Sequence, residues 1–274
     1  MATYFGEVLP VSSRAVDLDD DEDENDDELP QTLPSPVLQW SVHVQEELNH
    51  SKDKKLSCSK FLLAYGIEAN AFADIYLIKQ SSFEQIGSIF TSSDAVDEAT
   101  GFKDSRRNKT CSIFRDSNDS SALVCMCKRD VLPEESHTWT KLILDNIDLS
   151  HAVITVLTSF STGNYSSEIP QSQLKTPFLR CLKTTEYTAA AVCPALEQPN
   201  MLTGFPAMLM TFFQVQKYKA IIFVCYKENR FIEVANVKSF LKAALPFTIR
   251  TNLNTETMLV DLTEKHAIHD MIYM

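Results

Sequence analysis

The chain has 274 residues, and 44% of them are hydrophobic, so it can form one large domain or two smaller ones with a substantial core. Its net charge is −12, but residues 1–28 hold eleven acidic side chains against Arg14 alone, a sum of −10 that leaves −2 for residues 29–274. Proteins that bind nucleic acid cluster lysine and arginine, and the nearly neutral body has no such cluster, so we expect no nucleic-acid partner.

Residues 1–36 are predicted to form a mostly disordered acidic tail. Like charges between Asp17 and Glu28 repel one another, and the segment has too little apolar area to offset the entropy lost on ordering. The simplest role for such a tail is to keep the protein soluble, and a scaffold that acts through the tail is a functional alternative. Residues 37–274 are predicted to form a single domain that ends in a helix and an exposed tail.

In chain order, apolar runs and apolar residues at helical spacing predict alternating strands and helices. Fully apolar strands among helices are typical of a sheet that is covered on both faces. The expected fold is therefore α/β, a single three-layer α/β/α domain with a largely buried central sheet. The predicted elements are a strand at 60–65, a helix at 69–79, a strand at 83–90, a hairpin of strands at 111–115 and 122–128, a helix from Pro133, a strand at 151–160, a helix at 205–216, a strand at 220–226 and helices at 237–245 and 258–271, with polar loops at 92–109 and 163–176.

Two of these elements are predicted in more detail. Proline fits the first turn of a helix, because an N–H there would have no partner, so Pro133 marks a helix start. The strand at 151–160 is β-branched and almost continuously apolar, which favours a place at the centre of the sheet. The helix from Pro133 is expected to carry four apolar side chains on one face, namely Trp139, Leu142, Ile143 and Ile147.

No catalytic or cofactor-binding motif stands out. The six glycines do not form a phosphate-binding loop, and no G-x-S-x-G turn marks a nucleophilic serine. His266, His269 and Asp270 come nearest to a metal site, but zinc needs further ligands, and surface histidines near a helix end are the simpler interpretation. Cys193 has no cationic neighbour that would lower its pKa, so a packed cysteine is favoured over a nucleophile. We expect no cofactor, no metal and no enzymatic activity.

The seven cysteines indicate a reducing compartment. None forms a C-x-x-C pair, and they are spread through apolar runs, where free thiols pack in a core. Cys125 and Cys127 are expected on one face of a single strand. The start of the chain lacks the pattern of a signal peptide, and the longest apolar runs are too short to cross a bilayer. We expect a cytoplasmic protein without membrane insertion, with the nucleus or the surface of the endoplasmic reticulum as alternative locations.

The chain ends in Ile272, Tyr273 and Met274, which we predict to be a partner-binding site. A tyrosine so close to a chain end has no following segment to hold it in a core. A ring, an apolar side chain and a carboxylate suit a pocket with a cation at its mouth, an arrangement by which proteins capture C-terminal peptides. The alternative is the last turn of a terminal helix that carries these residues by chance.

The segment 177–226 has the most distinctive sequence. It contains Pro-Phe-Leu-Arg-Cys-Leu-Lys-Thr at 177–184, Cys-Pro-Ala-Leu-Glu-Gln-Pro-Asn at 193–200, Gly-Phe-Pro-Ala at 204–207 and Ala-Ile-Ile-Phe-Val-Cys-Tyr at 220–226. Together with Phe-Gly-Glu-Val at 5–8 and the final Ile-Tyr-Met, it closely resembles the proteasome assembly chaperone 1 family. The resemblance is dense over this segment, sparser over most of the remaining chain, and not evident at 92–118 and 161–175.

The resemblance implies a non-enzymatic chaperone that pairs with proteasome assembly chaperone 2. The heterodimer is expected on the outer face of the proteasome α-ring, where it favours correct ring assembly while the core particle is built. In this family's mode of binding, the tail of Ile272, Tyr273 and Met274 enters a pocket between neighbouring α-subunits, and a lysine meets its carboxylate. A nucleoside-phosphorylase-like α/β enzyme is the alternative from another class, and it would need a pocket with positioned acids and bases.

Overall fold

The computed structural model describes residues 35–51, 53–79, 82–90, 111–170, 173–228, 231–244, 247, 249 and 255–262. Apart from its last two positions, the predicted acidic tail of residues 1–36 lies outside the described residues, so the boundary between tail and domain stays a prediction. The polar loop predicted at 92–109 also lies outside them.

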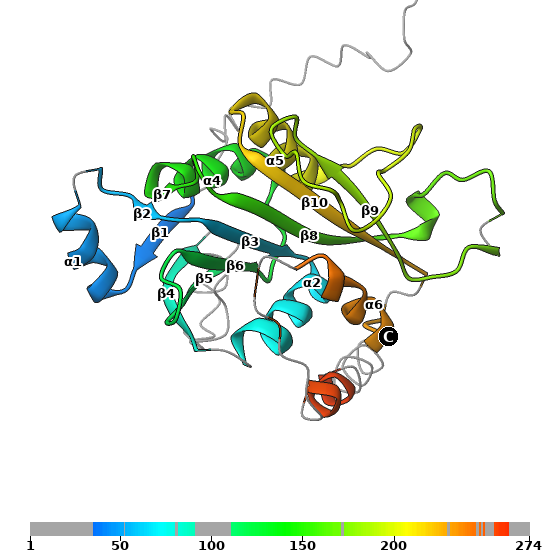
Figure 1. Cartoon of the computed structure of the whole chain (residues 1–274), viewed down its shortest axis with the longest axis horizontal. Helices are drawn as coiled ribbons and strands as arrows, with labels where there is room; N and C mark the ends of the chain where they lie inside the picture. Colours follow the sequence, from blue (N-terminus) through cyan, green and yellow to red (C-terminus); the bar gives the residue numbers. More distant parts are fainter. Residues whose placement is uncertain are drawn as a thin grey trace, which may run out of the picture. The chain divides into compact units, whose positions relative to one another are not determined.

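A mixed sheet of eight strands forms the centre of the described domain (Figure 1). In spatial order the strands are β1 (Val37–Trp40), β4 (Phe83–Phe90), β5 (Cys111–Asp116), β6 (Ala122–Cys127), β3 (Lys60–Tyr65), β8 (Val153–Ser161), β10 (Lys219–Lys227) and β9 (Phe178–Lys183). The central strands β6, β3, β8 and β10 run parallel to one another, and the outer strands pair antiparallel. Two short strands, β2 (Leu56–Ser57) and β7 (Ile147–Asp148), form a separate parallel pair.

Helices cover both faces of the large sheet (Figure 1). One face carries α4 (Pro133–Asn146) and α5 (Gly204–Val215). The other carries α2 (Ile67–Phe72), its π-helical continuation η1 (Ala73–Ile78), α6 (Val234–Lys238), the 3-10 turn η4 (Ser239–Lys242) and a helix at 255–262. In addition, α1 (Val42–His50) follows β1, and the 3-10 turn η2 (Thr162–Asn164) follows β8. The predicted three-layer α/β/α fold is confirmed.

Strand β10 shows why the central strands are apolar along their whole length. Successive side chains of a strand point to opposite faces of the sheet. Ile222 and Val224 pack into the core cluster that contains α4 and α5, whereas Ile221 and Phe223 pack into the cluster that contains α2 and α6. The neighbouring β8 has hydrogen-bonded strands on both sides, which confirms its predicted central place.

Most predicted elements occur where the apolar pattern placed them. The helix predicted at 69–79 begins earlier, at Ile67, and its second half is a π-helix. The helix predicted at 237–245 begins at Val234 and ends in a 3-10 turn, and the helix predicted at 258–271 is described at 255–262. The pattern does not predict β9, which lies at the edge of the sheet.

The predicted buried face of α4 needs one correction. Trp139 and Ile143 are buried in the helix, as expected, and Leu142 is half-buried. Ile147 lies beyond the end of the helix, because its backbone is extended and pairs with Leu56 in the small sheet. It reaches the same core cluster from a strand and not from the helix face.

Candidate functional site

The predicted binding residues Ile272, Tyr273 and Met274 lie outside the described residues, so their role stays a prediction. The last described helix, at 255–262, packs on the α2 face of the sheet, where Leu259 is fully buried. Lys238 on α6 donates to Glu256 at 2.7 Å and holds the start of this helix. Leu262 is therefore fixed against the domain ten residues before Ile272 in the sequence.

The carboxyl ends of β3 and β8 form the place where α/β proteins commonly bind ligands. The two strands are neighbours in the sheet, and the helices of their connections lie on opposite faces: α2 follows β3 on one face, and α5 lies on the other face, after β9, in the connection from β8 to β10. In open α/β sheets, this change of direction opens a crevice in which ligands bind. An enzyme of this fold would place its acids and bases here.

The side chains of Glu68, Ser159 and Lys227 meet at the carboxyl ends of these central strands. Gly66 has a φ of 92°, a left-handed conformation that suits glycine, and its turn places Glu68 at the start of α2. Ser159 Oγ on β8 donates to Glu68 Oε2 at 2.5 Å, and Lys227 Nζ at the end of β10 donates to Glu68 Oε1. Glu68 is only 1% exposed. Because both of its carboxylate oxygens are engaged, the cluster is built as a buried ion pair and not as an acid that faces a substrate.

A second polar cluster joins β9 to the loops beside it. Arg180 on β9 donates from Nε to Glu197 Oε2 at 2.9 Å and from Nη2 to Glu197 Oε1 at 3.3 Å. The hydroxyl of Tyr165, in the loop after β8, donates to the same carboxylate. These hydrogen bonds, chiefly those from Arg180, lower the pKa of Glu197 to about 2.

An aromatic cluster surrounds this ion pair. The rings of Tyr165, Phe178 and Tyr226 pack with centroid distances of 5.0, 4.7 and 5.3 Å. The Arg180 guanidinium lies 4.9 Å from the centroid of Phe178. Arg180, Phe178, Tyr226 and Glu197 all belong to the distinctive segment 177–226, so that segment supplies the contacts that hold this edge of the domain together.

The paired Glu197 makes stability depend on pH. Its pKa is lowered in the folded protein, so the ion pair contributes fully above the ordinary glutamate pKa of about 4.5, and the contribution is lost as the pH falls from there toward about 2. We expect Glu197→Gln to lower the free energy of unfolding by about 1 kcal/mol at pH 6, because Glu197 is about half exposed and solvent screens the pair. Urea unfolding at pH 6 and near pH 2.5 would measure this, and an equal difference at both values would contradict it.

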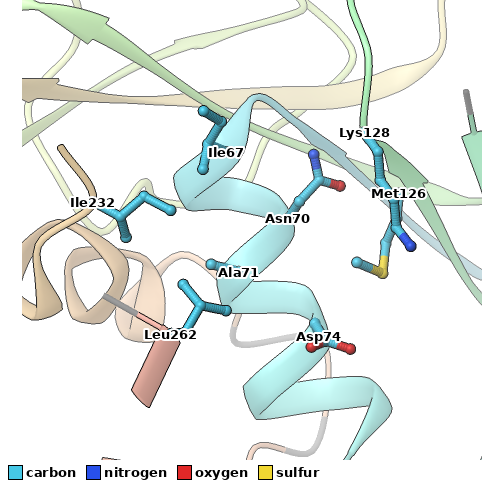
Figure 2. Close-up of a pocket in the computed structure, with 8 residues that line it drawn as sticks. All are labelled: Ile67, Asn70, Ala71, Asp74, Met126, Lys128, Ile232 and Leu262. Atoms are coloured by element: carbon cyan, nitrogen blue, oxygen red, sulfur yellow. The ribbon is translucent and has the colours of Figure 1, made fainter. Parts of the chain in front are cut away.

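An open pocket lies on the exposed side of α2 (Figure 2). Its volume of about 300 Å³ is at the lower end of the range for ligand pockets, ~300–1,000 Å³. Residues 67, 70, 71 and 74 fall on one helix face and form its floor. In Figure 2, Asn70 points toward Met126 and Lys128, and Ala71 points toward Leu262. This α2 pocket is lined by Ile67, Asn70, Ala71, Asp74, Met126, Lys128, Ile232 and Leu262.

Six of the seven thiols are buried, and that of Cys193 is half-buried. Burial raises the pKa of Cys193 to about 12 and outweighs Arg180, which lies close enough to lower this pKa and corrects the expectation that Cys193 has no cationic neighbour. The thiolate form is therefore scarce at neutral pH, in agreement with the packed-cysteine interpretation. Cys125 and Cys127 point into the same core cluster, which confirms that they share a strand face. Cys127 Sγ lies 2.9 Å from Cys111 Sγ on the neighbouring strand.

His266, His269 and Asp270, the nearest approach to a metal site in the sequence, lie outside the described residues. Within the described part of the chain, no group of three or more His, Cys, Asp or Glu side chains is arranged to hold a metal ion. None of the helices formed by described residues is long and apolar enough to cross a bilayer.

Fold and site thus define an α/β domain whose two polar clusters are built from paired charges. Several solved structures share this fold. A protein of unknown function from Thermoplasma acidophilum aligns with a TM-score of 0.60 at 14% identity, covering 85% of this chain and 94% of that one. Pyrococcus furiosus PbaA, described as an archaeal homolog of proteasome-assembly chaperone, aligns with a TM-score of 0.56 at 10% identity and coverages of 86% and 96%. P. furiosus PbaB, described as an archaeal proteasome activator, aligns with a TM-score of 0.54 at 10% identity and coverages of 88% and 99%.

The chain belongs to the PAC1 family, whose model carries the description Proteasome assembly chaperone 4 and matches residues 1–274. Proteasome assembly chaperone 1 of Xenopus tropicalis is 30% identical over 250 residues, which cover 88% of this chain and 87% of that protein. The Danio rerio protein of the same name is 30% identical over 244 residues, with coverages of 88% and 88%. The resemblance drawn from residues 177–226 is therefore confirmed.

Proposed function

We propose that this protein is a chaperone for assembly of the proteasome core particle and not an enzyme. It pairs with proteasome assembly chaperone 2, and the heterodimer binds the outer face of the proteasome α-ring in the cytoplasm. The observation that carries the proposal is membership of the PAC1 family over residues 1–274. The names of its relatives and of the archaeal proteins with the same fold support a role connected with the proteasome.

The tail of Ile272, Tyr273 and Met274 is proposed as one of the contacts with the α-ring. Ordering each residue of a free tail costs on the order of 1–2 kcal/mol, and a buried aromatic anchor contributes ~2 kcal/mol or more. The net affinity of three residues is therefore small. A second contact through the partner or the body of the domain raises it, because tethered contacts bind at a high effective concentration.

The enzyme alternative rests on one observation, the polar cluster at the carboxyl ends of β3, β8 and β10. Glu68, Ser159 and Lys227 occupy the position at which α/β enzymes hold their ligands. Their mutual pairing favours a structural role, because a general acid or base needs an oxygen that reaches the substrate. The chaperone is therefore the function that we propose.

Deletion of residues 272–274 tests the proposal. We expect the truncated protein to bind α-rings about 3- to 10-fold more weakly, because the deletion removes the aromatic anchor of ~2 kcal/mol together with part of the ordering cost that offsets it. Heterodimer formation should be unchanged, since the body of the domain makes that contact. Co-purification with proteasome assembly chaperone 2 and with α-subunits measures both.

Two substitutions serve as controls for this deletion. Tyr273→Phe keeps the ring and should bind nearly normally, whereas Tyr273→Ala should resemble the deletion. Normal α-ring binding by the truncated protein would refute the role of the tail. Loss of the heterodimer in the truncated protein would refute the proposal that the body of the domain, and not the tail, binds proteasome assembly chaperone 2.

A further inference from the structure

The α2 pocket combines an apolar surface with polar groups that lack partners among the described residues. Ile67 is 52% exposed at its floor, and Ile232 and Leu262 supply further apolar wall. The small side chain of Ala71 leaves the depression between them. Such a surface suits one or two apolar side chains of a peptide better than a ligand the size of a nucleotide, because its volume is only about 300 Å³.

Asn70 lines this pocket with an amide whose hydrogen bonding is incomplete. Its Nδ2 atom donates to the carbonyl oxygens of Gly66 at 2.8 Å and Cys127 at 2.5 Å, which fixes the orientation of the amide. Its Oδ1 atom is buried and has no hydrogen-bond partner among the described residues. An unpartnered buried acceptor is costly, so a ligand whose N–H group displaces the atoms that cover Oδ1 would gain a favourable contact here.

Lys128 supplies a positive charge on the β6 side of the pocket (Figure 2). It is exposed, and it forms no ion pair with another described residue. The acidic group of the pocket, Asp74, is already paired with Lys79 at 2.6 Å. The described part of the pocket therefore combines apolar surface, a buried acceptor without a partner and a cation without an ion pair. A peptide with apolar side chains, a backbone N–H and a negatively charged end matches all three.

We propose that the α2 pocket binds this chain's own C-terminal segment, residues 263–274. The segment carries Ile272 and Tyr273 as apolar groups, and its negative side chains, Glu264 and Asp270, outnumber its one positive side chain, Lys265. It follows directly from Leu262, which itself lines the pocket. Twelve residues can span up to about 40 Å at ~3.3 Å each, which is ample for a return to the pocket.

This contact regulates the tail, a consequence that rests on the proposed function. A short tether gives a local concentration of about 1 mM, so a contact with a Kd of about 1 mM is occupied half of the time. Occupied tails are unavailable to the α-ring. Release of the tail from the α2 pocket would then raise the apparent affinity for α-rings about 2-fold or more.

Photo-crosslinking of the full chain tests the contact without any partner. Tyr273 is replaced by p-benzoylphenylalanine, the dilute protein is irradiated, and cross-linked peptides are identified by mass spectrometry. We expect intramolecular cross-links to residues 67–74 and 126–128. Lys128→Glu should reduce these cross-links at least about 3-fold, because it turns attraction for the negatively charged end into repulsion. Lys141→Glu makes the same charge change on an exposed site of α4, on the opposite face of the sheet, and should have no effect.

A second variant, Ala71→Phe, fills the floor of the pocket and should also reduce the cross-links, with circular dichroism to show that the variant is folded. Cross-links to other surfaces, cross-links between molecules, or yields that do not change with Lys128→Glu would overturn the proposal. The result is independent of α-ring binding: a tail that cross-links in the α2 pocket but contributes nothing to the ring would refute the proposed function and leave this contact standing.

Discussion

Replacing Lys227 with methionine is expected to lower the free energy of unfolding by about 3–5 kcal/mol. The substitution leaves the Glu68 carboxylate buried at the carboxyl ends of the central strands, where Ser159 is its remaining partner among the described residues and the Lys227 cation is gone. A charge that loses its cation inside a protein costs far more than a surface pair contributes. Since domains of this kind are typically stable by only ~5–15 kcal/mol, the variant would lose a large share of its stability. Denaturant unfolding followed by circular dichroism measures the loss.

Two controls make the result specific to the buried charge. The double variant Glu68→Gln/Lys227→Met removes both charges and should recover most of the loss, because the amide that replaces the carboxylate can still bind the Ser159 hydroxyl. Lys238→Met breaks the exposed ion pair with Glu256 and should cost less than about 1 kcal/mol. Equal losses in Lys227→Met and Lys238→Met would show that replacing Lys227 does not leave an uncompensated buried charge on Glu68. A gain in stability would instead favour a strained site kept for chemistry.

Replacing Trp139 with alanine is expected to lower the free energy of unfolding by about 3–5 kcal/mol. Trp139 is fully buried, and its ring meets Phe205 edge-to-face at 5.0 Å and 87°. It therefore holds α4 against α5 over one face of the sheet, and its removal leaves a cavity that the packed layer closes only in part. Circular dichroism is the suitable measurement, since Trp139 is one of only two tryptophans and its removal changes the fluorescence by itself.

Trp139→Phe is the matched control, because it keeps an aromatic contact with Phe205 and leaves a smaller cavity. Its loss should lie clearly below that of the alanine variant. Similar losses for both would mean that the particular shape of the indole, and not the filled volume, holds α4 in place.

The central strands and the helices that cover them were predictable because most of their buried side chains are apolar. Runs such as Ala220–Tyr226 are apolar at every position, a pattern that is typical of a short strand covered on both faces. Strand β9 was not predicted, because Arg180 and Lys183 interrupt its apolar pattern. Its extended conformation is stabilised by antiparallel pairing with β10. The π-helical turn η1 likewise shows no sequence signal of its own, since Ala73–Ile78 reads as ordinary amphipathic helix.

The polar clusters could not be predicted for a different reason. Glu68 and Lys227 are 159 residues apart in sequence, and only the order of β3, β8 and β10 brings them together. The sequence around Glu68 does not indicate that it pairs with Lys227, and the sequence around Lys227 does not indicate Glu68, because glutamate and lysine are both common on protein surfaces. The hydrogen bonds of Arg180 and Tyr165 to Glu197 depend in the same way on two loops that meet beside β9.

The sequence by itself determined the alternation of strands and helices, the place of the acidic charge in residues 1–28, the family resemblance of 177–226 and the proposal that Ile272, Tyr273 and Met274 bind a partner. Each of these depends on local composition or on the order of residues along the chain. Only the tertiary structure decided the strand order, the pairing of Glu68 with Lys227 and the α2 pocket, in which Asn70 Oδ1 has no partner among the described residues. Those features depend on burial and on distances between remote segments, and both are set when the helices pack onto the sheet.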